Sequence, residues 1–141
     1  MIKKILLLAV ATLAFNSINY AQADRDNHKD NLLFLLRKTE HIEQAIKTID
    51  QLYSNSQSNI STGKVVIIVC GEAVTSLSTD RAKKWVNNIQ RFPDVKILAC
   101  GLSLRKFKVN TDSLVTGVDY TENGFIKAFE LQKQGYLSVE L

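Results

Sequence analysis

Two kinds of hydrophobic pattern alternate along this chain of 141 residues. Apolar runs at 32–36, 65–69 and 95–100 are short enough for strands buried on both faces of a sheet. Apolar positions three and four apart over 42–53 and 82–89 are typical of amphipathic helices. The pattern also predicts strands at 114–118 and 136–139, a loop at 73–79, and a short helix after residue 100. A last helix is predicted over 122–134, with Phe125, Ala128, Phe129 and Gln132 on one side.

The order of these elements sets the fold class. Strands that alternate with helices form a parallel sheet with helices on both faces. We therefore predict one open three-layer α/β/α sandwich with about five mainly parallel strands. In such sheets, ligands bind beyond the carboxyl ends of the strands. Cys70-Gly71, Cys100-Gly101 and Asp119-Tyr120 each follow a predicted strand, so we expect them to line one edge of the domain.

The first residues indicate an export signal. Lys3 and Lys4 precede an apolar stretch, Ile5 to Phe15, which is too short to span a bilayer. Ala21-Gln22-Ala23 then matches the small-x-small pattern of a cleavage site. We predict a signal peptide at 1–23, a single domain at 24–141, and a periplasmic or secreted location with no membrane span after processing. The alternative is an uncleaved N-terminal anchor.

Charge and missing motifs exclude several classes of function. The signal holds two lysines and no acid, so the net charge falls from +4 to +2 once it is removed. No basic stripe is interleaved with aromatic residues, which makes nucleic acid a poor partner. Phosphate-loop and dinucleotide-binding glycine motifs are absent, and His28 and His41 lack metal-ligand spacing. We predict neither a cofactor nor a metal.

Cys100 is the strongest chemical candidate in the sequence. It closes a predicted strand and precedes a predicted helix start, where free N–H groups and the helix dipole favour a thiolate. Arg105, Lys106 and Lys108 place positive charge nearby in the sequence. A glycine follows both Cys70 and Cys100, and we expect it to keep each thiol reachable.

Two other interpretations of the cysteines remain open. Cys70 and Cys100 are both compatible with simple packing as small hydrophobes at strand ends. They are also compatible with a disulfide, which needs Cα atoms within about 7 Å. A strand between theirs would separate them by about 10 Å, twice the spacing of neighbouring strands, so we predict two free thiols.

Three segments resemble the DsrE/DsrF-like family of sulfur-relay proteins, in its small secreted branch. Val69-Cys70-Gly71 resembles the end of a family strand, and Ala99 to Leu104 is similar to the family's Cys-x-x-x-Leu segment. Gly117-Val118 together with Leu131 to Tyr136 resembles the closing L-Q-x-x-G-Y. The resemblance covers the chain from about Asn31 to its end.

This resemblance implies a flavodoxin-like domain that assembles into trimers or hexamers. It also implies that Cys100 carries sulfane sulfur as a persulfide, exchanged with a sulfur donor or acceptor protein. Cys70 departs from the family pattern. We assign Cys100 as the catalytic residue and expect the sulfur substrate to be bound by the residues around it: Cys70, Gly71, Gly101, Ser103, Arg105 and Lys106. The rival hypothesis is a non-catalytic oligomeric module that binds a ligand or a protein, with Cys100 merely packed.

Overall fold

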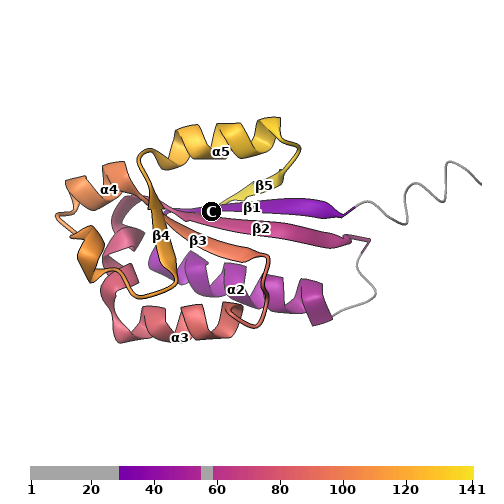
Figure 1. Ribbon diagram of the computed structural model, residues 1–141, viewed down its shortest axis with the longest axis horizontal. Coiled ribbons are helices and arrows are strands. Elements are labelled where there is room, and N and C mark those ends of the chain that lie inside the picture. Colours follow the sequence, from indigo (N-terminus) through magenta and orange to yellow (C-terminus); the bar gives the residue numbers. More distant parts are fainter. Residues whose placement is uncertain (1–28, 55–58) are drawn as a thin grey trace, which may run out of the picture.

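The computed structural model describes residues 29–54 and 59–141. The predicted signal peptide at 1–23 lies outside the described residues. Within them, five strands form one sheet in the order β4-β3-β2-β1-β5, and every neighbouring pair is parallel (Figure 1). The strands are β1 (Asp30–Leu36), β2 (Thr62–Val69), β3 (Val95–Cys100), β4 (Val118–Thr121) and β5 (Leu137–Glu140).

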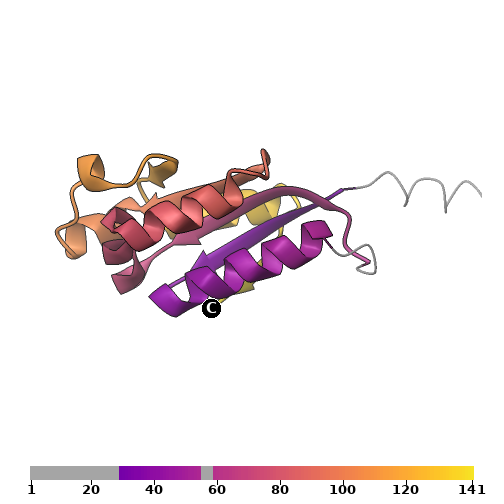
Figure 2. The same ribbon diagram turned by 90° about the horizontal axis from the view of Figure 1, so that it is seen from below.

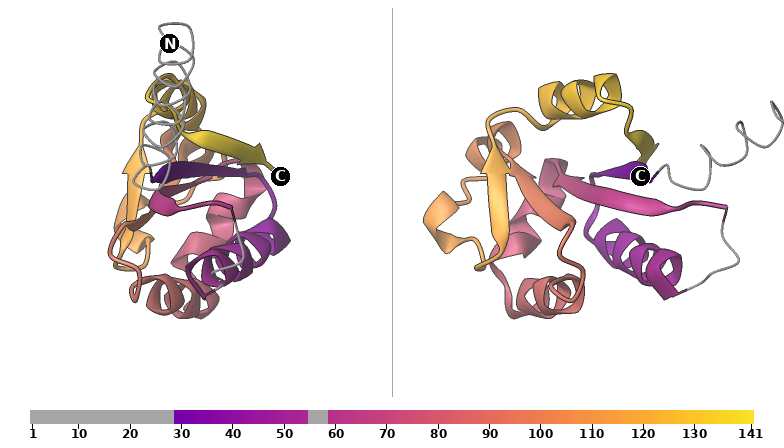
Figure 3. Two further views of the ribbon diagram at one scale, coloured as in Figure 1. Left: turned by 90° about the vertical axis from the view of Figure 1, so that its right-hand side faces the viewer. Right: turned by 45° about the vertical axis from the view of Figure 1, so that its right-hand side comes forward.

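Helices cover both faces of the sheet, which confirms the predicted three-layer α/β/α sandwich of flavodoxin-like type. Figures 1 and 3 place α5 on one side of the sheet, and Figure 2 shows α2 and α3 side by side across the other. The helices are α2 (Thr39–Ser54), α3 (Asp80–Ile89), α4 (Gly101–Lys106) and α5 (Gly124–Lys133), with two 3-10 helices, η1 (Gly71–Ser78) and η2 (Thr111–Ser113). Among the described residues, no helix is long and apolar enough to cross a membrane.

The strands alternate their side chains between two cores of unequal size. Leu32, Phe34 and Leu36 of β1 face the larger core, which α2, α3 and η1 complete. Leu33 and Leu35 face the smaller core, to which α5 contributes Ala128 and Leu131. This is why β1 reads as an unbroken apolar run: a central parallel strand is buried on both faces. The edge strands β4 and β5 are short and largely exposed.

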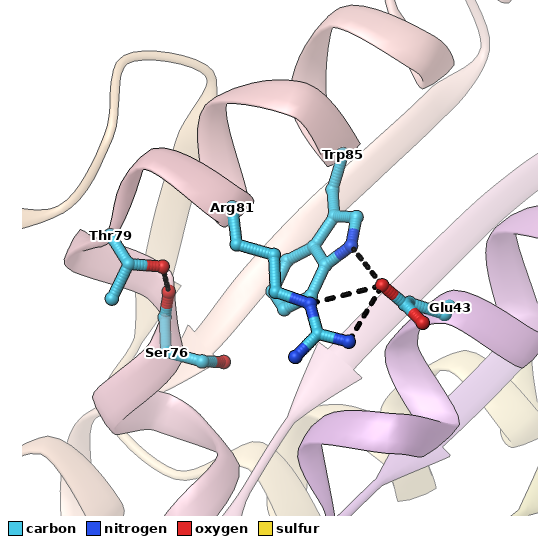
Figure 4. A network of polar contacts seen from close by, with 5 residues as sticks. All are labelled: Glu43, Ser76, Thr79, Arg81 and Trp85. Atoms are coloured by element: carbon cyan, nitrogen blue, oxygen red, sulfur yellow. Dashed lines mark hydrogen bonds and ion pairs between the residues drawn. The ribbon is translucent and has the colours of Figure 1, made fainter.

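A polar clamp joins the two helices on the larger core. The carboxylate of Glu43 on α2 lies 2.9 Å from Arg81 Nη2 and accepts a 3.4 Å hydrogen bond from Trp85 Nε1, both on α3 (Figure 4). These bonds hold the pKa of Glu43 below its ordinary value, chiefly through the hydrogen bond from Arg81. At the start of α3, Thr79 occupies the cap position, but its hydroxyl donates back to Ser76 at 2.6 Å rather than capping the helix.

Two predicted elements differ from the structure. The segment predicted as a loop at 73–79 is mostly the 3-10 helix η1, whose Ala73, Val74 and Leu77 are buried in the larger core. The strand predicted at 114–118 begins only at Val118. The N–H of Val115 bonds the carbonyl of Leu77, and Gly117 turns the chain at a φ of +96°, so the apolar residues before Val118 pack on η1 and not in the sheet.

The buried side of α5 also differs from the prediction. Of the residues placed on one side, only Ala128 is buried, whereas Phe125 and Phe129 are 41% and 69% exposed. The helix presents Gly124, Ala128 and Leu131 to the sheet instead. Small residues at this face let the helix start approach the ends of β2 and β3 closely.

Candidate functional site

The carboxyl ends of β2, β3 and β4 lie side by side at one edge of the sheet. Val69 of β2 pairs with Ala99 of β3, so Cys70 and Cys100 follow at neighbouring positions of neighbouring strands. The predicted meeting of these two strand ends is therefore confirmed. Asp119 and Tyr120, which we expected beyond the fourth strand, lie inside β4, and it is Thr121 that pairs with Cys100.

The Cys100 sulfur is surrounded by hydrogen-bond donors. Gly124, at the start of α5, donates its backbone N–H to Cys100 Sγ at 3.3 Å. The N–H and hydroxyl of Ser103 and the thiol of Cys70 are further donors close to the same sulfur. The residue is only 1% exposed. The sulfur thus lies in a pocket of donors under the protein surface and not on the open edge that its following glycine suggested.

These donors decide the ionisation of Cys100. Burial raises the pKa of the Cys100 thiol, but the hydrogen bonds from Gly124, Ser103 and Cys70 outweigh burial and bring the pKa below its ordinary value. The lowered pKa that the sequence predicted is therefore present. Its cause is local hydrogen bonding.

Cys70 shows the opposite behaviour. It is also 1% exposed, and burial together with the neighbouring negative charge of Cys100 raises the pKa of the Cys70 thiol to about 12. A thiol that keeps its proton can donate to a thiolate that has lost one. The two cysteines are free in this structure. Since β2 and β3 are neighbours, the intervening strand that we invoked against a disulfide does not exist.

The glycines shape the site through their backbones. The N–H of Gly71 donates to Ser103 Oγ at 2.8 Å, which orients the hydroxyl beside Cys100. Gly71 holds a φ of +61°, a conformation that favours glycine. A Cβ on Gly101 would lie 2.9 Å from the carbonyl oxygen of Glu122, so only glycine lets α4 begin this close to the end of β4.

Arg105 and Lys106 do not take the role that the sequence suggested. The Arg105 guanidinium is paired with the Glu122 carboxylate at 3.0 Å, and Lys106 lies over its neighbour Phe107. Both side chains are exposed, and neither is among the main causes of the lowered pKa of Cys100. Both residues follow the first turn of α4, which places them beyond the donors that contact the sulfur. Hydrogen-bond donors at the starts of α4 and α5, and not side-chain cations, therefore stabilise the Cys100 thiolate.

Gly124 is the functional residue that sequence reasoning missed. Its N–H donates to Cys100, and a Cβ there would lie 2.8 Å from Cys70 Sγ and 3.1 Å from Cys100 Cβ. Asn123 caps α5, accepting from the N–H of Phe125 at 3.0 Å and so leaving the Gly124 N–H to the sulfur. The Asn-Gly pair signals a helix start, but only the folded chain brings it to the cysteines.

A separate cavity lies on the α5 face, away from the cysteines. It has a volume of about 460 Å³ and lies towards the amino ends of β2 and β3. Its lining residues are Lys64, Val66, Pro93, Asp94, Lys96, Leu98, Asp119, Lys127 and Tyr136. No residue assigned to the predicted site lines this cavity.

Within residues 29–54 and 59–141, no cluster of His, Cys, Asp and Glu could hold a metal ion. His41, whose spacing did not suggest a metal ligand, is half-buried, and its Nδ1 has no hydrogen-bond partner in this part of the chain. His28 lies outside the described residues.

Comparison with solved structures supports the fold. The chain is similar to protein MTH1491 from Methanobacterium thermoautotrophicum, a protein of unknown function, with a TM-score of 0.63 and 17% identity over 81% of this chain and 100% of that one. It is similar to BT1422 from Bacteroides thetaiotaomicron, a conserved protein of unknown function, with a TM-score of 0.58 and 17% identity over 79% and 95% of the two chains. No protein-family model and no curated protein matches the sequence. At this level of identity the neighbours establish the fold alone.

Proposed function

We propose that this protein handles sulfur, with Cys100 taking sulfane sulfur from a donor and holding it as a persulfide. The observation that carries the proposal is the donor set around Cys100 Sγ, above all the Gly124 N–H at 3.3 Å. Thiolates are the nucleophilic form of cysteine, and this set favours the thiolate inside a buried site. The sequence resemblance to DsrE/DsrF-like proteins points to the same chemistry.

The hydrogen-bond donors around Cys100 stabilise both the thiolate that reacts and the persulfide that forms. A Cys100 thiolate attacks the sulfane sulfur of the donor, forms a new S–S bond and expels the donor's remaining anion. The resulting persulfide is also an anion, so the donors that favour the thiolate also stabilise the loaded state. The site needs neither a metal nor an organic cofactor for this step. A periplasmic or secreted location, with processing before Asp24, remains part of the proposal.

Burial restricts what can reach the sulfur. At 1% exposure, Cys100 offers almost no surface to a protein acceptor. A small anion such as polysulfide needs a smaller opening than a protein does, at the start of α5, where Gly124 packs against both cysteines. We therefore favour small sulfane-sulfur anions as donors over direct delivery from a large protein.

Alkylation of the native protein tests the proposal. The rate of Cys100 alkylation should rise through an inflection below about 8.5, the pKa of an ordinary cysteine. The Cys100→Ser variant should lose this reactivity, and Cys70→Ser should keep it. A Cys100 that alkylates only after unfolding would contradict the proposal, because it would then be an inert core residue.

A second candidate is a non-catalytic oligomeric module that binds a ligand or a protein. Two observations favour it. Phe125, Ile126 and Phe129 form an exposed apolar stripe on α5. The cavity beside that helix is lined by three lysines and two aspartates, a mixed set of charges that suits a polar ligand. This candidate predicts that the oligomer and its ligand binding survive Cys100→Ser, whereas sulfur loading would not occur in any variant.

A further inference from the structure

Cys70 and Cys100 are the only cysteines in the sequence, and the fold places them side by side. Neighbouring strands lie about 4.8 Å apart, which falls within the Cα separations that disulfides span. The Cys70 thiol is close enough to donate to the Cys100 sulfur. The pair can therefore be joined without rearranging the sheet.

The two thiols also have complementary chemistry. The donors favour an anion at Cys100, whereas Cys70 faces the same sulfur as a neutral thiol. Once Cys100 carries an extra sulfur, its Sγ is bonded to another sulfur and becomes an electrophile. The nearest nucleophile to that Sγ is the sulfur of Cys70.

Burial favours attack on the loaded Cys100 by Cys70 over attack by an external protein. Both cysteines are 1% exposed, so a second protein cannot approach the loaded sulfur without opening the site. Cys70 needs no opening, because it already shares the smaller core with Cys100. The close approach of Gly124, where a Cβ would meet both cysteines, keeps the two sulfurs in one closed compartment.

We propose that Cys70 is the resolving thiol of this site and converts the Cys100 persulfide into a Cys70–Cys100 disulfide with release of sulfide. The proposal rests on the proposed sulfur-loading function of Cys100. It makes the protein a reductant of small sulfane-sulfur anions such as polysulfide. An external acceptor protein for the sulfur is then not required.

The step balances in atoms and electrons. The Cys70 thiol first passes its proton to the outer sulfur of the anionic persulfide, because the thiolate is the nucleophilic form of cysteine. Cys70 Sγ then attacks Cys100 Sγ, the Cys70–Cys100 S–S bond forms, and the bond from Cys100 Sγ to the outer sulfur breaks. The outer sulfur leaves with the bonding pair and already carries the proton, so it departs as hydrosulfide. The two cysteine sulfurs are oxidised and the sulfane sulfur is reduced. A small dithiol reductant, admitted by the same opening at the start of α5 as the polysulfide, then regenerates both thiols through ordinary thiol–disulfide exchange.

Intact mass measurement of the purified protein tests the proposal. The reduced wild-type protein, Cys70→Ser and Cys100→Ser are each incubated with sodium polysulfide without oxygen and then desalted. Cys70→Ser should gain one sulfur, about 32 Da, because its persulfide cannot be resolved. The wild-type protein should instead lose two hydrogens, about 2 Da, and yield a Cys70–Cys100 linked peptide on digestion. A dithiol should restore its mass, and Cys100→Ser should not change.

The outcomes separate the two proposals. If the wild-type protein keeps the added sulfur as Cys70→Ser does, Cys70 is not a resolving thiol, although Cys100 still carries sulfur. If neither the wild type nor Cys70→Ser gains or loses mass, sulfur loading itself is wrong. Because a serine hydroxyl in this core could disturb folding, Cys70→Ala is measured in parallel. Circular dichroism confirms that each variant is folded before its mass is interpreted.

Discussion

At the scale of single residues, two cysteines with almost no exposure differ in which form the fold prefers. Cys100 collects donors from Gly124, Ser103 and Cys70, while Cys70 has the charge of Cys100 beside it. Burial alone would raise the pKa of both thiols, and it is the position of the N–H groups that separates them. The difference allows one sulfur to act as the nucleophile and the other to hold its proton.

Replacing Gly124 with alanine tests the close packing of the site. Alanine favours helices over glycine by about 1 kcal/mol, but its Cβ would lie 2.8 Å from Cys70 Sγ and 2.9 Å from Ile68 Cγ2. Overpacking in a core costs about 1–3 kcal/mol, so we expect Gly124→Ala to lower the free energy of unfolding in urea. It should also raise the pH at which Cys100 alkylates, because the N–H donor moves away.

Gly135→Ala is the control for that variant. Gly135 has a φ of +88° and nothing within 4 Å of a Cβ, so alanine there brings backbone strain without a new contact. Its alkylation profile should match that of the wild type. A Gly124→Ala protein that is as stable as the wild type and alkylates at the same pH would show that this glycine does not shape the site.

The raised pKa of Cys70 predicts a loss of stability in alkali. In the unfolded chain Cys70 ionises near its ordinary pKa of about 8.5, whereas the folded protein holds the proton until about pH 12. The contribution of the protonated Cys70 thiol to the free energy of unfolding is thus complete below about pH 8.5, and it is lost as the pH rises towards 12. We expect the free energy of unfolding to fall by about 1 kcal/mol per pH unit from this group, as measured by denaturant titrations. In Cys70→Ala the decline over this range should be shallower, and equal slopes would contradict the assignment.

At the scale of elements, α5 is the one helix on its face of the sheet among the described residues, whereas α2, α3 and η1 share the other face. The same helix covers the cysteines and supplies the Gly124 N–H. Access to the site therefore depends on how firmly one short helix is docked. The α2–α3 clamp at Glu43 secures the opposite face and does not bear on the thiols.

Loosening α5 should open the site, and loosening α3 should not. Leu131 of α5 and Ile89 of α3 are 5% and 3% exposed, and truncation of either to alanine costs about 2–5 kcal/mol. When the two variants are equally stable, global unfolding exposes the cysteines to the same extent in both. Only Leu131→Ala should also raise the alkylation rate of Cys100 through local opening. Equal rates in variants of equal stability would show that α5 does not control access.

At the scale of the whole molecule, α5 presents a stripe of large apolar side chains to solvent. Phe125, Ile126 and Phe129 are 41%, 56% and 69% exposed, and they fall on one side of the helix. Contiguous apolar surface of this kind marks an interface. We propose a homo-oligomer, a trimer or a hexamer, in which α5 is covered by a second copy.

Light scattering at micromolar concentration tests the assembly. The wild-type protein should show the mass of an oligomer, and Phe129→Lys should shift it to monomer because a charge cannot be buried there unpaired. Gln44→Lys adds the same charge on the exposed side of α2 and should leave the oligomer intact. A wild-type protein that remains monomeric would contradict the proposal.

The sequence by itself determined the elements and the class of fold. The apolar runs at 32–36 and 65–69 can bury their side chains only between two layers of helices. The local pattern therefore predicts both the burial of these strands and a parallel sheet. The pattern fails where contacts distant in the sequence decide burial: it predicts a loop where η1 forms, and it starts the fourth strand at residue 114 and not at Val118. Both segments pack in the larger core, and the N–H of Val115 in one bonds the carbonyl of Leu77 in the other.

Tertiary structure alone decided the chemistry of the site. The sequence identified Cys100, its lowered pKa and one cause of it, the free N–H groups at the helix start that follows. It also credited Arg105 and Lys106, because adjacency in the chain was the only proximity available. The strand order made Cys70 its neighbour, and the return of the chain through β4 brought the Gly124 N–H to its sulfur. Hydrogen bonds form only at donor–acceptor distances of about 3 Å. Gly124 and Cys70 are 24 and 30 positions from Cys100 in the sequence, and no local pattern encodes such a close approach.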